Sequence, residues 1–96
     1  DNIEESAAAE AENDRDEAAF EYYEKGLQAY KNEDYSEAAG YFEQSAQYNP
    51  GVWQTYQYMG SCYLALGEEA RAKKAYQQSL KLNPDNSELK EWLETH

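Results

Sequence analysis

The chain contains YYEKGLQAYKNEDYSEAAGYFEQSAQYNP at Tyr22–Pro50 and YQYMGSCYLALGEEARAKKAYQQSLKLNP at Tyr56–Pro84, and this duplicated stretch decides its fold. At a shift of 34 residues, the two copies agree at small residues, at aromatic residues and at a closing Asn-Pro pair. A set of matches at one shift indicates an internal repeat. The matched pairs are Gly26 with Gly60, Ala38 with Ala72, Phe42 with Tyr76, Ser45 with Ser79, and Asn49-Pro50 with Asn83-Pro84.

Each copy has the pattern of two helices joined by a tight turn. Apolar side chains recur every three or four residues between Phe20 and Tyr30, which indicates a helix. Asp34 and Glu37 then have the spacing of a capping box for a second helix, and Pro50 ends that helix because proline disfavours helical geometry before it. The expected helices cover about 14–30, 35–48, 53–66, 68–82 and 87–96.

A 34-residue unit of two helices resembles the tetratricopeptide repeat (TPR) family, whose pattern runs W-x2-L-G-x2-Y, then Ala, an aromatic residue and Pro. The first copy has Lys25 and Ala29 where the family has Leu and Tyr, and both copies begin with Tyr instead of Trp. The resemblance implies an all-α fold: an α-α superhelix of two repeats, about 19–52 and 53–86, closed by a capping helix at about 87–96. The matching residues are Tyr22, Lys25, Gly26, Ala29, Ala38, Phe42, Ser45 and Pro50 in the first copy, and Tyr56, Met59, Gly60, Tyr63, Ala72, Tyr76, Ser79 and Pro84 in the second.

The charge of the chain is strongly acidic and unevenly placed. The 96 residues carry a net charge of −12, and residues 1–21 hold nine acids against one base. Residues 1–13 have few large apolar side chains, so we expect an acidic, disordered linker there. Asp14 and Glu17 have capping-box spacing, which predicts that the ordered domain covers residues 14–96.

The composition also limits the classes of partner and compartment. Nucleic acids and anionic membrane surfaces are disfavoured as partners, because phosphate binding depends on Lys and Arg charge. No apolar run is long enough to predict a transmembrane span. The chain starts at Asp1 without Met or a leader, so we expect a piece of a larger protein whose localisation is unknown. A single cysteine excludes an internal disulfide and slightly favours the cytoplasm.

No pattern in the sequence predicts catalysis, a cofactor or a metal site. His96 is the only histidine and the last residue, and Cys62 has no basic neighbour one helical turn away. Neither arrangement supplies the positioned base that a catalytic site needs. Clusters of ligand residues and glycine-rich phosphate loops are also missing from the sequence. We therefore expect a protein that is not an enzyme.

The family resemblance implies that the first helix of each repeat lines a concave groove that binds peptides or helices. The first repeat would contribute an aromatic half to this groove and the second a polar half. The subfamily that grips a carboxylate needs Lys and Asn at positions where this chain has Tyr23, Leu27, Gln57 and Ser61, so that clamp is absent. The groove residues are Phe20, Tyr23, Leu27, Tyr30 and Lys31 from the first repeat, and Gln54, Gln57, Ser61 and Leu64 from the second.

These features predict a protein-interaction scaffold, monomeric or weakly dimeric, that binds a protein or peptide partner. We expect an apolar or aromatic segment with hydrogen bonds from the two glutamines. One alternative is a structural unit that stacks or dimerises through its terminal helices. The aromatic stripe that begins at Phe20 and Tyr23 could also cover the capping helix or a neighbouring copy instead of a ligand.

Overall fold

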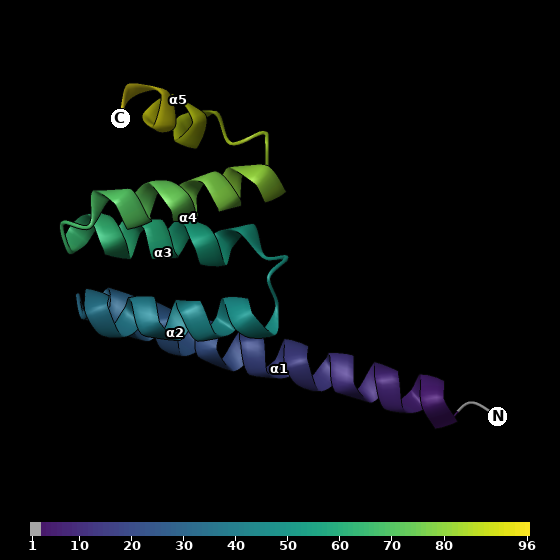
Figure 1. Cartoon of the computed structure of the whole chain (residues 1–96). Coiled ribbons are helices and arrows are strands. Elements are labelled where there is room, and N and C mark those ends of the chain that lie inside the picture. Colours follow the sequence, from purple (N-terminus) through teal and green to yellow (C-terminus); the bar gives the residue numbers. More distant parts are fainter. Residues whose placement is uncertain (1–2) are drawn as a thin grey trace.

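The computed structural model describes the backbone of residues 3–96 and the side chains from residue 14 onward. Residues 3–96 form an all-α solenoid, as predicted. Figure 1 shows two helical hairpins stacked on each other, with the last helix at the end of the stack. The helices are α1 (Ile3–Lys31), α2 (Tyr35–Tyr48), α3 (Trp53–Ala65), α4 (Glu69–Leu82) and α5 (Ser87–Thr95).

The N-terminal boundary differs from the one expected. Asp14 lies inside α1 and does not cap a helix, because the backbone is already helical from Ile3. Ala and Glu dominate this stretch and both have high helix propensity, so nothing in it interrupts the helix. Residues 1–2 lie outside the described chain, and of residues 3–13 only the helical backbone is described. The disordered linker over residues 1–13 therefore stays a prediction.

The turns inside the two hairpins close in the same way. The backbone N–H of Asp34 donates to the carbonyl of Ala29 over 2.9 Å. Thirty-four residues later, Glu68 donates to Tyr63 over 2.8 Å. Each turn needs one residue with a positive φ, supplied in the second hairpin by Gly67 (φ 79°), which has no Cβ to strain. In the first hairpin, Glu33 (φ 62°) accepts this conformation.

Inside each hairpin, an aromatic ring of the second helix packs against a glycine of the first helix. A Cβ on Gly26 would lie 2.7 Å from the ring of Phe42, and one on Gly60 would lie 2.5 Å from the ring of Tyr76. Both distances are shorter than van der Waals contact. Phe42 is 0 % exposed, so the predicted core position is confirmed. The aromatic ring fills the space that the glycine leaves open.

The same aromatic residues join each hairpin to the next helix. Phe42 stacks on Tyr58 of α3, with ring centroids 5.3 Å apart and planes at 10°. Tyr76 meets Trp92 of α5 edge to face at 4.9 Å. Trp92 is 34 residues after Tyr58, so α5 packs on α4 as α3 packs on α2. The predicted capping helix thus takes the place of the first helix of a third repeat.

A buried serine ties the second helix of each hairpin to the first. The Ser45 hydroxyl donates to the carbonyl of Ala19 over 2.6 Å, and the Ser79 hydroxyl donates to the carbonyl of Trp53 over 3.0 Å. Both bonds span 26 residues and are again offset by one repeat. They leave the buried hydroxyls with partners, which avoids the cost of an unsatisfied polar group.

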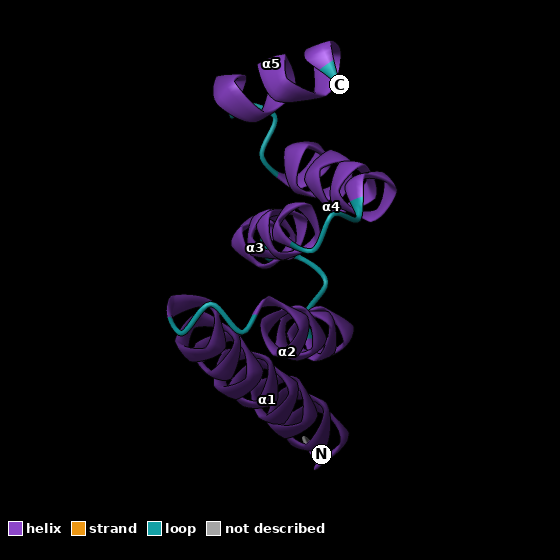
Figure 2. Cartoon of the chain, turned by 90° about the vertical axis from the view of Figure 1, so that its left-hand side faces the viewer, coloured by secondary structure: helices purple, strands orange, loops and turns teal. Residues whose placement is uncertain are grey.

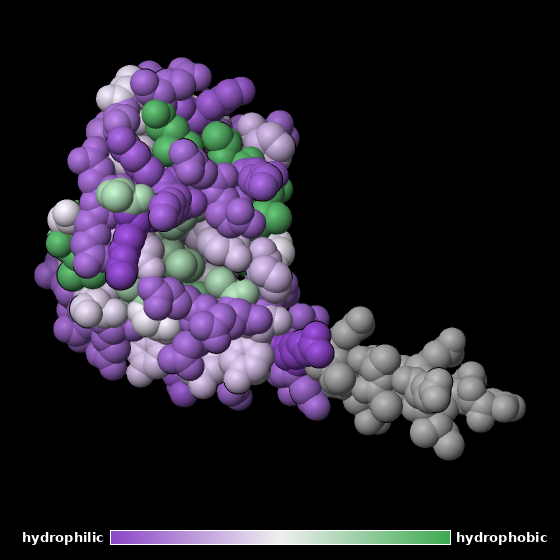
Figure 3. Space-filling view, viewed as in Figure 1, coloured by the Kyte–Doolittle hydropathy of each residue, from purple (hydrophilic) through white to green (hydrophobic). Residues whose placement is uncertain are grey.

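The stack has two different sides. Figure 2 shows α1 and α3 along one side of the stack and α2 and α4 along the other. Figure 3 views the side of α2 and α4, which is mostly hydrophilic, with paler and green atoms where the surface is hollowed between the hairpins. The first helices of the two hairpins thus form one surface of the stack, and the second helices form the other.

The contacts of the helical glycines predict that Gly→Ala substitutions change the free energy of unfolding in opposite directions at different positions. Gly26→Ala and Gly60→Ala should each lower the free energy of unfolding by about 1–3 kcal/mol, because the added methyl group overlaps an aromatic ring. Gly40→Ala, in α2, is the control: apart from its chain neighbours and the backbone of its own helix, no described atom lies within 4 Å of its Cβ position, so better helix propensity should raise stability by about 0.5–1 kcal/mol. Urea unfolding measures all three. Equal effects at Gly26 and Gly40 would contradict the packing described.

Candidate functional site

Two neighbouring hollows lie between α1 and α3, on the side where the family resemblance implies a groove. Their volumes are about 280 Å³ and 360 Å³, and Tyr23 and Gln54 line both. We call the two hollows together the α1/α3 groove. The first is lined by Asp16, Ala19, Phe20, Tyr23, Ser45, Asn49, Val52, Gln54 and Thr55, and the second by Tyr23, Tyr30, Trp53, Gln54, Gln57, Tyr58 and Ser61.

An aromatic cluster forms the inner wall of the groove. Tyr58 of α3 meets Tyr23 and Tyr30 of α1 edge to face, with centroids 6.0 Å and 5.4 Å apart. Its other face stacks on the buried Phe42. Tyr23 and Tyr30 are therefore half-buried by α3, and not by the capping helix, and they serve the core as well as the groove. Among the described residues that line the groove, Phe20, which is 60 % exposed, offers a largely uncovered aromatic ring.

Sequence reasoning missed Tyr58 as a groove residue. The position that matches it in the first copy is Glu24, so repeat alignment does not mark it as structural. Its spacing from Gln54, four residues earlier on α3, was the available signal, because residues i and i+4 share a helix face.

The polar half of the groove is held by hydrogen bonds to other elements. The Gln57 side-chain carbonyl accepts from the Asn86 amide over 3.2 Å, and Asn86 caps α5 by accepting from Leu89 N–H. The Ser61 hydroxyl donates to the Gln57 backbone carbonyl and lies 3.1 Å from the Tyr76 hydroxyl. Gln57 and Ser61 are thus oriented in advance by α4 and α5. Gln54 makes no side-chain hydrogen bond to any residue from 14 to 96.

The groove is weakly acidic. Among the residues whose side chains are described, Asp16 is the only charged one that lines the two hollows, and its carboxylate accepts from the Asn49 amide over 3.2 Å. Burial, and to a smaller extent nearby Tyr58, raises the pKa of the Tyr23 phenol. At neutral pH the Tyr23 hydroxyl therefore keeps its proton and can donate a hydrogen bond. The surface suits apolar, hydrogen-bonding or cationic groups and disfavours anions.

Six of the nine predicted groove residues come together in this surface, and three do not. Leu27 packs against the hydrophobic core. Lys31 is exposed at the end of α1 and lines neither hollow. Leu64 lines a separate hollow beside Trp92 and His96, because it lies near the far end of α3, next to α5. The six are Phe20, Tyr23, Tyr30, Gln54, Gln57 and Ser61.

The residues considered for catalysis have structural surroundings. Cys62 is 0 % exposed. The imidazole ring of His96 stacks on the indole of Trp92, and its Nδ1 lies 2.8 Å from the backbone carbonyl of Trp92. Within the described side chains, no three His, Cys, Asp or Glu residues are grouped to hold a metal ion. No helix among residues 3–96 combines the length and apolar character needed to cross a bilayer.

Comparison with known proteins identifies the repeat and its relatives. A family model described as "Tetratricopeptide repeat" matches residues 29–93. The chain is 36 % identical over 74 residues to a protein of Prochlorococcus marinus subsp. pastoris named "Photosystem I assembly protein Ycf3", and this match covers 74 % of the chain and 43 % of the relative. A protein of the same name from a Synechococcus species is 39 % identical over 75 residues, covering 75 % of the chain and 43 % of the relative. The chain thus spans less than half the length of these relatives.

The environment of Cys62 predicts an inert thiol. Burial raises the pKa of Cys62 from 9.0 to about 11, so at pH 8 the thiolate is roughly a hundredfold scarcer than in an unfolded chain. Ellman's reagent should therefore react slowly with the native protein and rapidly in 6 M guanidinium. Because the unfolded chain ionises first, stability should also fall between about pH 9 and 11, and less so in Cys62→Ala. Rapid labelling of the native protein at pH 8 would contradict this environment.

Proposed function

Because this chain belongs to the tetratricopeptide repeat family, we propose that it is a protein-interaction module whose α1/α3 groove binds a peptide or helix of a partner. The family match and the relatives named as assembly proteins point to a non-catalytic interaction role. One observation supports this groove as the binding surface. It combines a largely exposed Phe20 with two open hollows that the side chains of residues 14–96 do not fill.

The lining of the groove supports a ligand with an apolar or aromatic anchor. Phe20 and Tyr23 border the first hollow, where such an anchor would bury its side chain beside two rings. Gln54 has no protein partner among residues 14–96 and can bond the backbone of an extended ligand. Asp16 at the edge of the same hollow favours a basic residue next to the anchor.

The relatives add a biological direction to the proposal. Proteins named for the assembly of photosystem I are similar to this chain over about three quarters of its length. We therefore propose that the bound segment belongs to a protein on its way into a larger complex. The chain would hold this segment as one domain of a larger protein. The alternative remains a self-assembly unit, in which the groove or the terminal helices face another copy.

A matched pair of double variants tests the groove. Phe20→Ala with Gln54→Ala removes one exposed apolar residue and one glutamine from the groove. Leu82→Ala with Gln77→Ala makes the same chemical change on exposed positions of α4, outside the groove. Peptides selected from a display library on the parent protein should bind the groove variant at least about tenfold more weakly, since hot-spot truncations cost 2 kcal/mol or more. The α4 variant should retain its affinity, measured by calorimetry.

The same variants separate the two functions. Both should melt within a few degrees of the parent, because the substituted side chains are exposed or, at Gln54, half-buried without a hydrogen-bond partner among residues 14–96. Peptides that bind all three proteins equally would overturn the groove as the binding site. Sedimentation at several concentrations covers the alternative: a dimer that the groove variant cannot form would identify the groove as a self-assembly surface.

A further inference from the structure

The basic residues of this acidic chain concentrate on one helix. Of the eight Lys and Arg residues in the sequence, four lie in α4, together with the single acid Glu69. α4 therefore carries +3, and the remainder of the chain carries −12 − 3 = −15. An isolated basic helix on a strongly acidic protein creates a local field opposite in sign to its surroundings. The four bases are Arg71, Lys73, Lys74 and Lys81.

Two of these bases border a hollow on the side of the stack opposite the groove. The hollow has a volume of about 470 Å³ and lies between α2 and α4, over α3. Figure 3 views the molecule from the side of α2 and α4, which Figure 2 shows edge-on, and the hollow lies on this side. We call it the α2/α4 hollow. Its lining residues are Glu43 from α2, Tyr56, Met59 and Tyr63 from α3, and Arg71, Lys74, Ala75 and Gln78 from α4.

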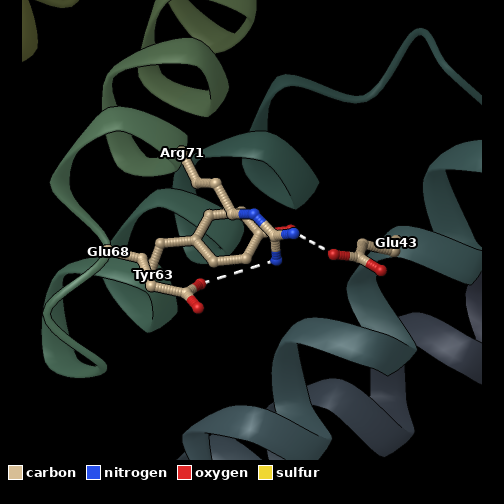
Figure 4. Close-up of polar contacts among 4 residues, drawn as sticks. All are labelled: Glu43, Tyr63, Glu68 and Arg71. Atoms are coloured by element: carbon tan, nitrogen blue, oxygen red, sulfur yellow. Dashed lines mark hydrogen bonds and ion pairs between the residues drawn. The ribbon is translucent and has the colours of Figure 1, made fainter.

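Arg71 is held over an aromatic ring and has donors to spare. Its guanidinium carbon lies 5.8 Å from the centroid of the Tyr63 ring. Its ion pair with Glu68 is long, at 3.6 Å, and both side chains are largely exposed, so that pair contributes little. Figure 4 shows the guanidinium over the Tyr63 ring, with Glu68 on one side of it and Glu43 on the other. Stacking limits the motion of a guanidinium while its in-plane N–H groups stay available for a carboxylate.

The acid in the hollow already has a partner. The Tyr63 hydroxyl donates a hydrogen bond to Glu43, which joins α3 to α2 across the hollow. Burial of Tyr63, and then this hydrogen bond, raises the pKa of the phenol, so the donor keeps its proton. Glu43 is thereby held by Tyr63, and among residues 14–96 Glu43 forms no ion pair with Arg71 or Lys74. The positive charges remain available to an external anion.

Lys74 extends the positive edge by one helical turn. It is exposed, lines the same hollow and lies three residues after Arg71, which places both side chains on one face of α4. Below them, Met59 and Ala75 offer an apolar floor. The hollow thus combines two cations at its rim with an apolar surface beneath them.

We propose that the α2/α4 hollow binds an acidic segment of a partner protein. A Glu or Asp carboxylate of the segment bonds Arg71 and Lys74, and an adjacent apolar side chain rests on Met59. The charge of the hollow selects carboxylates, which arginine binds with two parallel hydrogen bonds. A partner is favoured over a second copy of this chain, because two copies of net charge −12 repel each other. This second surface is separate from the groove, so one chain can hold two segments at once.

The test uses the full chain and a synthetic peptide. The probe is fluorescein-labelled Gly-Leu-Glu-Asp-Leu-Glu-Gly, and its control has Gln and Asn in place of Glu and Asp. In fluorescence anisotropy, Arg71→Gln with Lys74→Gln should weaken binding of the acidic probe at least about tenfold, since charge-assisted hydrogen bonds are lost. Lys31→Gln with Lys90→Gln makes the same change in net charge at exposed positions outside the hollow, and it should weaken binding less than about threefold. The groove variant Phe20→Ala with Gln54→Ala should bind the probe normally.

Three results would overturn the proposal. The acidic probe could fail to bind, or the neutral probe could bind equally well. The two charge variants could also weaken binding equally, which would mean that only the net charge of the protein matters. Sedimentation addresses the other source of carboxylates, the nine acids of residues 1–21 in a second copy. If the parent self-associates and Arg71→Gln with Lys74→Gln abolishes this self-association, the acidic segment belongs to a second copy and not to a partner protein. Normal probe binding by the groove variant would show that the α2/α4 hollow acts independently of the α1/α3 groove, so failure of one proposal can be told from failure of the other.

Discussion

The structure depends on an aromatic side chain of each second helix that contacts a glycine on one side and an aromatic ring on the other. Phe42 lies against Gly26 within its own hairpin and against Tyr58 of the next helix. Tyr76 lies in the same way between Gly60 and Trp92. One ring therefore fixes both the spacing inside a hairpin and the stacking between hairpins. The two surfaces of the molecule follow from this stacking, because it sets how far apart α1 and α3, and α2 and α4, can lie.

The sequence predicts this scaffold because every unit must satisfy the same contacts. Ser45 and Ser79 recur because each hydroxyl bonds a carbonyl in the first helix of its own hairpin. The helix from Tyr35 to Tyr48 has the predicted bounds, and α3 and α4 differ from theirs by one residue. The long α1 was not predicted, because a capping pattern at Asp14 cannot be distinguished by sequence alone from the same residues inside a continuing helix.

The candidate groove was harder to predict, because its residues do not repeat. Tyr58 has no aromatic counterpart in the first copy, although it covers Tyr23 and Tyr30. The bond between Gln57 and Asn86 joins residues 29 positions apart and depends on where α5 begins. Helical periodicity gives the face of a side chain but not its partner on another helix. Leu64 illustrates this limit, since it shares a helix with Gln57 yet lines a different hollow next to α5.

The last described helix, α5, has two different sides. Trp92 contacts Tyr76 as the sequence equivalent of Tyr58 on Phe42, so the outer surface of a second helix is used a second time. The far side of α5 is exposed and charged, at Glu88, Lys90, Glu91 and Glu94. A following helix would find no apolar stripe there. Apolar residues at those four positions would therefore give this nine-residue helix a second face on which a further helix could pack.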